Sequence, residues 1–176
     1  MLPKRLRSFI EDADIPLSLA DAQTPDMPLV LVNAAFERLT GYLSEEVVGQ
    51  NCRFLQGNTD QPEARSEVRA LLSGRADGQV VLKNYRKNGE RFDNLLFLFP
   101  IEIGGKLAYF LGSQFEATGE DTLSDSAARG GYLKAHLATL QTDTRILKAQ
   151  TRRTTSESIA IAARTLVTLS TTRGAR

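Results

Sequence analysis

The amino-acid sequence predicts an α+β domain in which a five-stranded antiparallel sheet carries helices on one face. Five short apolar segments are typical of strands, two of them before and three of them after a central run of helical segments. The last three strands are separated by Asn88-Gly89 and Gly104-Gly105, which are turn sequences. Strands, then helices, then a strand meander indicate an antiparallel sheet with helices packed against it.

The elements follow in order along the first two thirds of the chain. Residues 2–12 fit a short amphipathic helix, which either caps the core or forms a surface shared with a partner chain. The expected strands cover residues 17–20, 29–33, 79–86, 91–101 and 107–115. The expected helices cover residues 34–40 and 62–73, with a further helical turn at 44–48. We therefore expect an N-terminal cap helix over residues 1–14 and the main domain over residues 15–118.

The C-terminal third, residues 119–176, has a different composition. Residues 1–120 hold 13 Lys and Arg against 17 Asp and Glu, a net charge of −4, whereas residues 121–176 hold 9 against 4, a net charge of +5. After a linker, a stripe recurs at spacings of 4, 3, 4 and 3, which is typical of a coiled coil: Leu133, Leu137, Leu140, Thr144 and Leu147. Thr151-Arg152-Arg153 interrupts it, and Thr154 with Glu157 could form a capping box. The pattern predicts a C-terminal helical hairpin.

The bulk composition restricts the class of protein. The single cysteine, Cys52, cannot form an internal disulfide, and cysteine spacing offers no zinc site. No apolar run is long enough to span a bilayer. We therefore expect a cytoplasmic protein that is not bound to a membrane.

The segment around Cys52 is chemically unusual. It reads Gly49-Gln50-Asn51-Cys52-Arg53-Phe54-Leu55-Gln56-Gly57 and gathers carboxamides, a guanidinium and apolar side chains around the thiol. This mixture suits a planar ligand with a polar edge and an anionic tail. The segment resembles the signature of the light-oxygen-voltage (LOV) domains, flavin-binding members of the PAS family, and matches each of its fixed positions from Gly49 to Gln56.

The resemblance implies a blue-light sensor, not an enzyme, that binds flavin mononucleotide (FMN). In such a sensor Cys52 forms a reversible bond to carbon 4a of the flavin. The resemblance also implies a PAS fold, with Asn51 and Gln56 lining the pocket and Leu55 packing the segment in place. Arginine suits a phosphate because its planar fork bonds two oxygens. Arg53 matches the family position for this task, Arg69 matches by its distance from the signature, and Arg65 could assist.

Three side-chain amides, one on each meander strand, suit the polar edge of a flavin because amides both donate and accept hydrogen bonds. They are Asn84, Asn94 and Gln114. For Asn84 and Asn94 to share a face, the hairpin loop must have an odd length, so we expect three residues with Gly89 left-handed. Leu96 and Leu98 then alternate with Asn94 toward the same pocket.

The sequence leaves more than one output open. The apolar stripes of the tail need burial, and we expect a homodimer formed through the N- and C-terminal helices that light rearranges or loosens. In that reading Gln114, on the last strand, passes the change in the flavin to the flanking helices. The alternative is a light-regulated DNA-binding protein that uses the basic helical hairpin, although its basic residues are spread out and nucleic acid is the less favoured partner. A redox flavoenzyme is a third possibility, but no acid or base for a substrate is evident.

Overall fold

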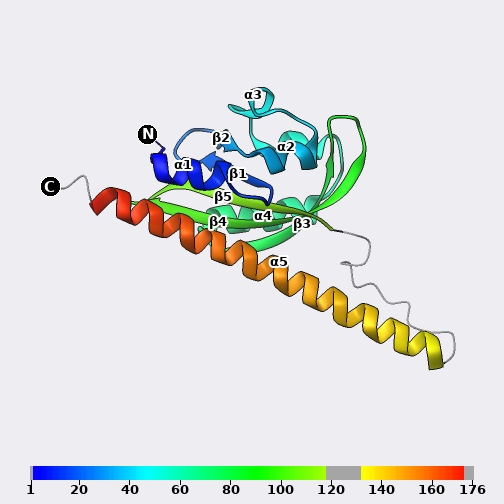
Figure 1. Ribbon diagram of the computed structural model, residues 1–176. Helices are drawn as coiled ribbons and strands as arrows, with labels where there is room; N and C mark the ends of the chain where they lie inside the picture. The colour runs from blue at the N-terminus through cyan, green and yellow to red at the C-terminus, as the bar shows by residue number, and fades with distance from the viewer. Residues whose placement is uncertain (1, 118–131, 173–176) are drawn as a thin grey trace.

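The protein folds around one five-stranded antiparallel sheet, seen in a computed structural model that describes residues 2–117 and 132–172, with the side chains of 132–146, 171 and 172 excepted. The strands are β1 (Leu17–Asp21), β2 (Leu29–Val32), β3 (Gly78–Tyr85), β4 (Arg91–Ile103) and β5 (Lys106–Ala117). Their order across the sheet is β2-β1-β5-β4-β3, so the first and last strands of the domain meet at its centre (Figure 1). The predicted fold class is confirmed.

Short helices fill the connection between β2 and β3. They are α2 (Ala34–Thr40), α3 (Ser44–Val47), the 3-10 helix η1 (Cys52–Gln56) and α4 (Pro62–Gly74). Asn33 begins α2, because its side-chain oxygen accepts a hydrogen bond from the Phe36 amide, and Gly41 ends it with a left-handed φ of 77°. Pro62 occupies the first turn of α4, where its missing N–H costs nothing.

The opposite face of the sheet is covered by α1 (Lys4–Glu11) and α5 (Tyr132–Thr172) (Figure 1). Leu6 and Ile10 of α1 are fully buried in one apolar cluster with Ala160, Ala163 and Val167 of α5. The same cluster holds alternate residues of β4, such as Phe97 and Phe99. In this chain α1 is therefore a cap on the core, and helices lie on both faces of the sheet.

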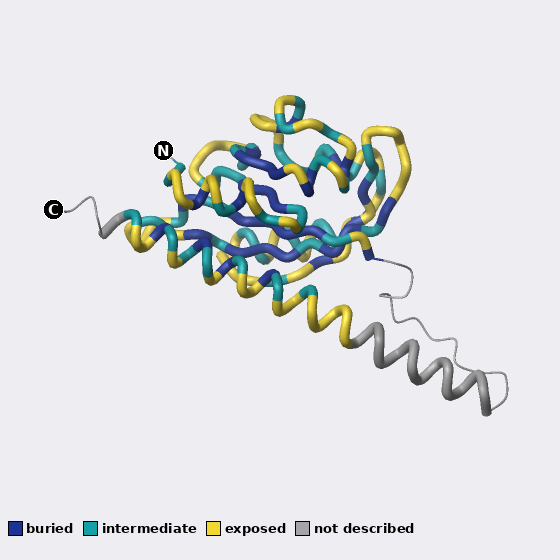
Figure 2. Tube along the Cα trace, viewed as in Figure 1, coloured by how far each residue is buried: buried dark blue, intermediate teal, exposed yellow. Residues whose placement is uncertain are grey.

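The predicted C-terminal hairpin is wrong, because one continuous helix, α5, spans residues 132–172. Thr151, Arg152 and Arg153 lie inside it, and no capping box forms at Thr154. Threonine and arginine are tolerated within a helix, so the interruption in the apolar pattern marks a change of contacts rather than a turn. Figure 2 shows the consequence: the helix becomes exposed where it extends past the sheet, and Leu147, Lys148, Ala149 and Gln150 are all exposed. The predicted linker lies mostly outside the described residues.

Candidate flavin site

A cavity of about 530 Å³ lies between the sheet and the connecting helices η1 and α4. Ten of the twelve predicted site residues line it: Asn51, Cys52, Arg53, Gln56, Arg65, Arg69, Asn84, Asn94, Leu96 and Leu98. Leu55 and Gln114 do not line it. The cavity therefore brings together side chains from segments far apart in the sequence.

The segment that carries Cys52 is held in place by its neighbours. The Asn51 side-chain oxygen accepts a hydrogen bond from the Arg53 amide at 2.9 Å and so begins η1. The Asn51 side-chain nitrogen donates to the backbone oxygen of Asp26 and, at 3.5 Å, to that of Met27. Leu55 points away from the cavity into a buried cluster with Phe36. Leu55 thus anchors η1 to the body, as its packing role predicts.

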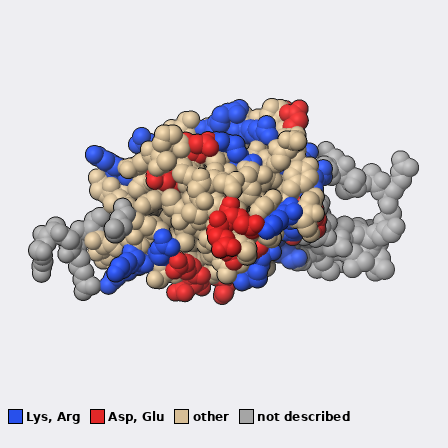
Figure 3. Space-filling model, turned by 90° about the horizontal axis from the view of Figure 1, so that it is seen from above, with Lys and Arg blue, Asp and Glu red and all other residues tan. Residues whose placement is uncertain are grey.

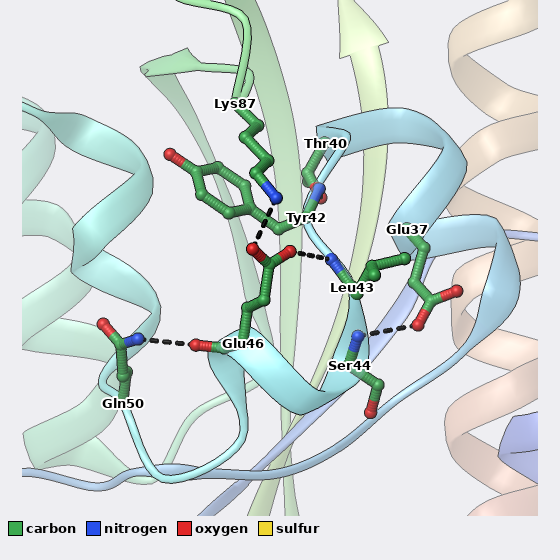
Figure 4. A network of polar contacts seen from close by, with 8 residues as sticks. All are labelled: Glu37, Thr40, Tyr42, Leu43, Ser44, Glu46, Gln50 and Lys87. Carbon is green, nitrogen blue, oxygen red and sulfur yellow. Dashed lines mark hydrogen bonds and ion pairs between the residues drawn. The ribbon is translucent and has the colours of Figure 1, made fainter.

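A polar network fixes the chain just before this segment (Figure 4). The Glu46 carboxylate accepts a hydrogen bond from the Leu43 amide at 2.8 Å and pairs with the Lys87 ammonium. The hydrogen bond from Lys87, with that from Leu43, lowers the pKa of the Glu46 carboxyl. The Gln50 side chain donates to the Glu46 backbone oxygen at 2.6 Å. These contacts tie α3 to the β3–β4 hairpin and restrict the position from which η1 starts.

The Cys52 thiol stands on the cavity wall as a neutral group. Cys52 is half-buried, and it lines the cavity. Protein atoms nevertheless desolvate the sulfur, and this burial raises the pKa of the Cys52 thiol to about 12. No histidine or other base assists it among the described residues, because the only histidine is His136 in α5. A thiolate-dependent reaction at neutral pH is therefore disfavoured.

The three amides carry the least ordinary feature of the site. Asn84 and Asn94 are 2% exposed and Gln114 is 0% exposed. Within the described part of the chain, the side-chain oxygen of each lacks a hydrogen-bond partner. Buried polar atoms are almost always paired, so three such orphans in one region indicate a ligand with polar hydrogens and acceptors of its own.

Gln114 lies one layer behind the cavity wall. Its side-chain nitrogen donates to the Ser18 hydroxyl at 2.8 Å, and Ser18 lines the cavity. Gln114 faces Leu96 across the β4–β5 pairing, and Leu96 lines the cavity as well. A rearrangement at the cavity wall can thus reach Gln114 through one intervening side chain.

The hairpin register places Asn84 and Asn94 on one face. Asn84 pairs with Phe92 and Leu82 with Asn94, so the loop holds three residues, Lys87 to Gly89. Gly89 has a φ of 86°, and the Arg86 amide bonds the Glu90 oxygen at 2.8 Å. The predicted odd loop is confirmed.

The arginines divide into engaged and available groups. Arg53 pairs with the Asp26 carboxylate at the cavity mouth. Arg65 donates to the Gln56 side-chain oxygen and to the Thr59 backbone oxygen, both at 2.9 Å. Arg69 makes no hydrogen bond or ion pair within the residues that the structure covers, and it lines the cavity. An anion at this end would meet two arginines of α4 beside Arg53.

Eight lining residues were missed by the sequence analysis, and Ala20 and Met27 also line the cavity: the eight are Ser18, Leu29, Gly57, Val68, Leu72, Leu82, Phe110 and Gly112. Strand alternation could have found Gly112, which lies two residues before Gln114. A Cβ at Gly112 would stand 2.8 Å from the Ser18 hydroxyl and 3.3 Å from Leu96, so a side chain there would press on the cavity wall.

Comparisons with known proteins agree with this geometry. The profile of the PAS domain family matches residues 19–118. The crystal structure of the Rhodobacter sphaeroides LOV protein superposes with a TM-score of 0.63 at 34% identity, covering 94% of each chain. The chain belongs to the LOV family of blue-light photoreceptors. A blue-light-activated histidine kinase of Rhizobium johnstonii is 46% identical over 61% of this chain and 32% of that protein. A blue-light photoreceptor of Listeria innocua is 37% identical over 61% of this chain and 43% of that protein.

The chain spans about a third to under half the length of these curated LOV relatives. A LOV family member implies a flavin, and the residues present fit one. Asn84 and Asn94 on the cavity wall and Gln114 behind it have orphaned amide oxygens, and Arg53, Arg65 and Arg69 line the same cavity. Within the described residues, no group of three or more acidic, histidine or cysteine side chains could hold a metal ion, and none of the helices is long and apolar enough to cross a membrane.

Proposed function

We propose that this LOV protein is a blue-light sensor that binds FMN and forms a reversible bond between the Cys52 sulfur and carbon 4a of the flavin. The observation that carries the proposal is the presence of a neutral thiol and the orphaned amides of Asn84 and Asn94 on the wall of one cavity, with the orphaned amide of Gln114 directly behind that wall. The amides are diagonal neighbours across β3, β4 and β5, and they supply donors and acceptors for the polar edge of the ring. The arginines select a flavin that carries a phosphate.

The neutral thiol suits a light-driven reaction better than an enzymatic one. A cysteine nucleophile in the dark needs a base or a cation to become a thiolate, and burial opposes that here. When it is bound and excited by blue light, a flavin is a strong oxidant and base that can react with a neutral thiol. Cys52 would then keep its proton in the dark and would pass it to nitrogen 5 of the flavin as its sulfur bonds to carbon 4a.

The amide of Gln114 is suited to sense that proton. The Gln114 side chain can present either its oxygen or its nitrogen to a ring atom that changes from acceptor to donor. Its oxygen is unpaired and its nitrogen bonds Ser18, so rotation exchanges which group faces Ser18. Gln114→Leu should keep the photochemistry and lose the response of the flanking helices.

A second copy of this chain is the proposed partner. The stripe predicted from Leu133 to Leu147 continues along α5 at the same 4 and 3 spacing, and its described members are all exposed and uncharged: Leu147, Thr151, Thr154, Ser158, Ile161, Thr165 and Thr168. A stripe with a 3.5-residue period packs against a copy of itself. Because most of its members are Ser or Thr, the contact is weak and open to control by light.

Absorption spectroscopy of the purified protein tests the photochemical proposal. We expect a flavin band in the blue that bleaches on illumination and returns in the dark. Cys52→Ala should keep the band and lose the bleaching. A wild-type protein that carries no flavin, or a flavin that does not bleach, would contradict the proposal.

The basic tail does not favour nucleic acid as the partner. The two-helix unit on which that alternative depended does not form, because α5 is continuous. The face of the domain seen in Figure 3 carries both basic and acidic side chains. We therefore propose no DNA-binding function.

A further inference from the structure

Two residues of α5 hold β5 on either side of Gln114. The Ser113 hydroxyl donates to the Ser156 hydroxyl at 2.7 Å, and both serines are 0% exposed. The Arg152 guanidinium donates to the Glu116 backbone oxygen at 3.1 Å and stands 5.7 Å from the centre of the Phe115 ring. Arg152 and Ser156 are four residues apart and therefore share one face of the helix.

Gln114 lies between these contacts but faces the other way. Successive side chains of a strand point to opposite faces of the sheet. Ser113 therefore points to the side covered by α5, and Gln114 points to the side on which the cavity lies. The pairings agree: Ser113 lies opposite Leu17 and Phe97 of the apolar cluster under α5, and Gln114 lies opposite Leu96 of the cavity wall. One step along the backbone thus joins the two faces of the sheet.

We propose that Ser156, supported by Arg152, is the positioning residue through which β5 controls α5. This inference rests on the proposed light-sensing function and adds the output contact to it. A displacement of β5 at Gln114 changes the separation of the Ser113 and Ser156 hydroxyls. Both hydroxyls are buried, so they either move together or lose their partners. The pair therefore passes a small shift of the strand to the helix instead of absorbing it.

Arg164 makes further polar contacts between α5 and the rest of the domain, and these contacts are more open to water than the Ser113–Ser156 bond. Arg164 donates to the Pro100 oxygen at 3.1 Å and pairs with Asp77, and these contacts are partly exposed. A contact open to water can exchange its partner for a water molecule at little cost. Within the described residues, the Ser113–Ser156 bond joins α5 to the sheet through two fully buried partners, and it adjoins Gln114.

The test compares Ser156→Ala with Ser170→Ala, which removes a partly exposed hydroxyl that donates to the Leu166 oxygen of the same helix and lies outside the stripe proposed for the dimer. Each full-length holoprotein is measured in the dark and under blue light for flavin bleaching, dark recovery and amide hydrogen exchange in α5. We expect Ser156→Ala to bleach fully but to lose the light-minus-dark difference in exchange. Because α5 would no longer hold β5 beside Gln114 through this bond, its dark recovery rate should also differ from that of wild type. Ser170→Ala should match wild type in all three.

A merely structural role for Ser156 predicts a different result. Hydrogen exchange in α5 would then rise equally in dark and light, with the difference and the recovery rate unchanged, and that outcome would overturn the inference alone. Failure of the wild type to bleach would overturn the proposed function with it. If Ser156→Ala folds poorly, the double variant Ser113→Ala/Ser156→Ala leaves no orphaned hydroxyl and should still lack the light-dependent difference. Arg152→Gln, with Arg153→Gln as its control, should weaken the same difference.

Discussion

The Cys52 thiol combines a buried position with a reactive task, and its protonation state shows how these fit together. Burial raises its pKa from 9.0 to about 12, so the folded protein holds this proton where the unfolded chain has begun to lose it. In neutral solution the thiol is protonated in both the folded and the unfolded state, so stability does not depend on its ionisation there. Between about pH 9 and pH 12 the unfolded state alone ionises, so stability falls as the pH rises.

Alkylation kinetics test this protonation state. At pH 8 the raised pKa leaves Cys52 with a much smaller thiolate fraction than an unfolded thiol. Iodoacetamide should therefore modify the native, flavin-free protein far more slowly than the chain in denaturant. The rate should keep rising with pH up to the limit of folding. Native alkylation as fast as in denaturant would show that the thiol is not desolvated.

Asn94 is expected to lower the stability of the flavin-free protein and to strengthen the binding of flavin. Its side-chain oxygen is buried without a partner in the ligand-free chain, which costs about 1–3 kcal/mol. Asn94→Leu, of similar volume, should therefore raise the free energy of unfolding of the flavin-free protein by about 1 kcal/mol while it weakens flavin binding. Urea denaturation and flavin titration measure the two effects. A variant that loses stability in the flavin-free state would assign Asn94 a structural role instead.

At the scale of the elements, the β3–β4 hairpin decides which side chains face the cavity. Its three-residue loop depends on Gly89, whose φ of 86° is unfavourable for any residue with a Cβ. Nothing lies within 4 Å of a Cβ placed there, so Gly89→Ala isolates the backbone effect, and we expect a loss of about 1 kcal/mol by thermal unfolding. Gly74→Ala, at the end of α4 without a positive φ, should instead be neutral or stabilising. Equal effects of the two variants would contradict this reading of the loop.

The same hairpin shows what the sequence could and could not predict. The spacing of Asn84 and Asn94 required an odd loop because alternation along a strand is strict, so local rules were sufficient. They were insufficient for α5. Thr151 to Arg153 break an apolar repeat, but helix continuation depends on backbone hydrogen bonds and on the sheet contacts of Arg152 and Ser156, which no local pattern reveals. Likewise, Ser18 lies at the site because β1 pairs with β5, a strand far away in the sequence.

In the whole molecule, α5 is one long helix that packs one face against the sheet and leaves another face in solvent (Figure 1). Ala160, Ala163 and Val167 occupy the inner face, while Ile161, 63% exposed, belongs to the outer stripe. A helix committed to the sheet on one side can meet a second copy only through the other. Movement of α5 on the sheet would then change the geometry of the dimer directly.

Association measurements test this arrangement. Ile161→Glu places a charge in the middle of the stripe, where the partner's identical charge would face it, and should raise the dimer dissociation constant about tenfold or more. Lys148→Glu introduces the same side chain at an exposed position next to the stripe and should have a smaller effect. Sedimentation velocity in the dark and under blue light measures both. Wild-type association by Ile161→Glu, or a wild type that is monomeric in dark and light, would remove the outer face of α5 as the site of dimerisation.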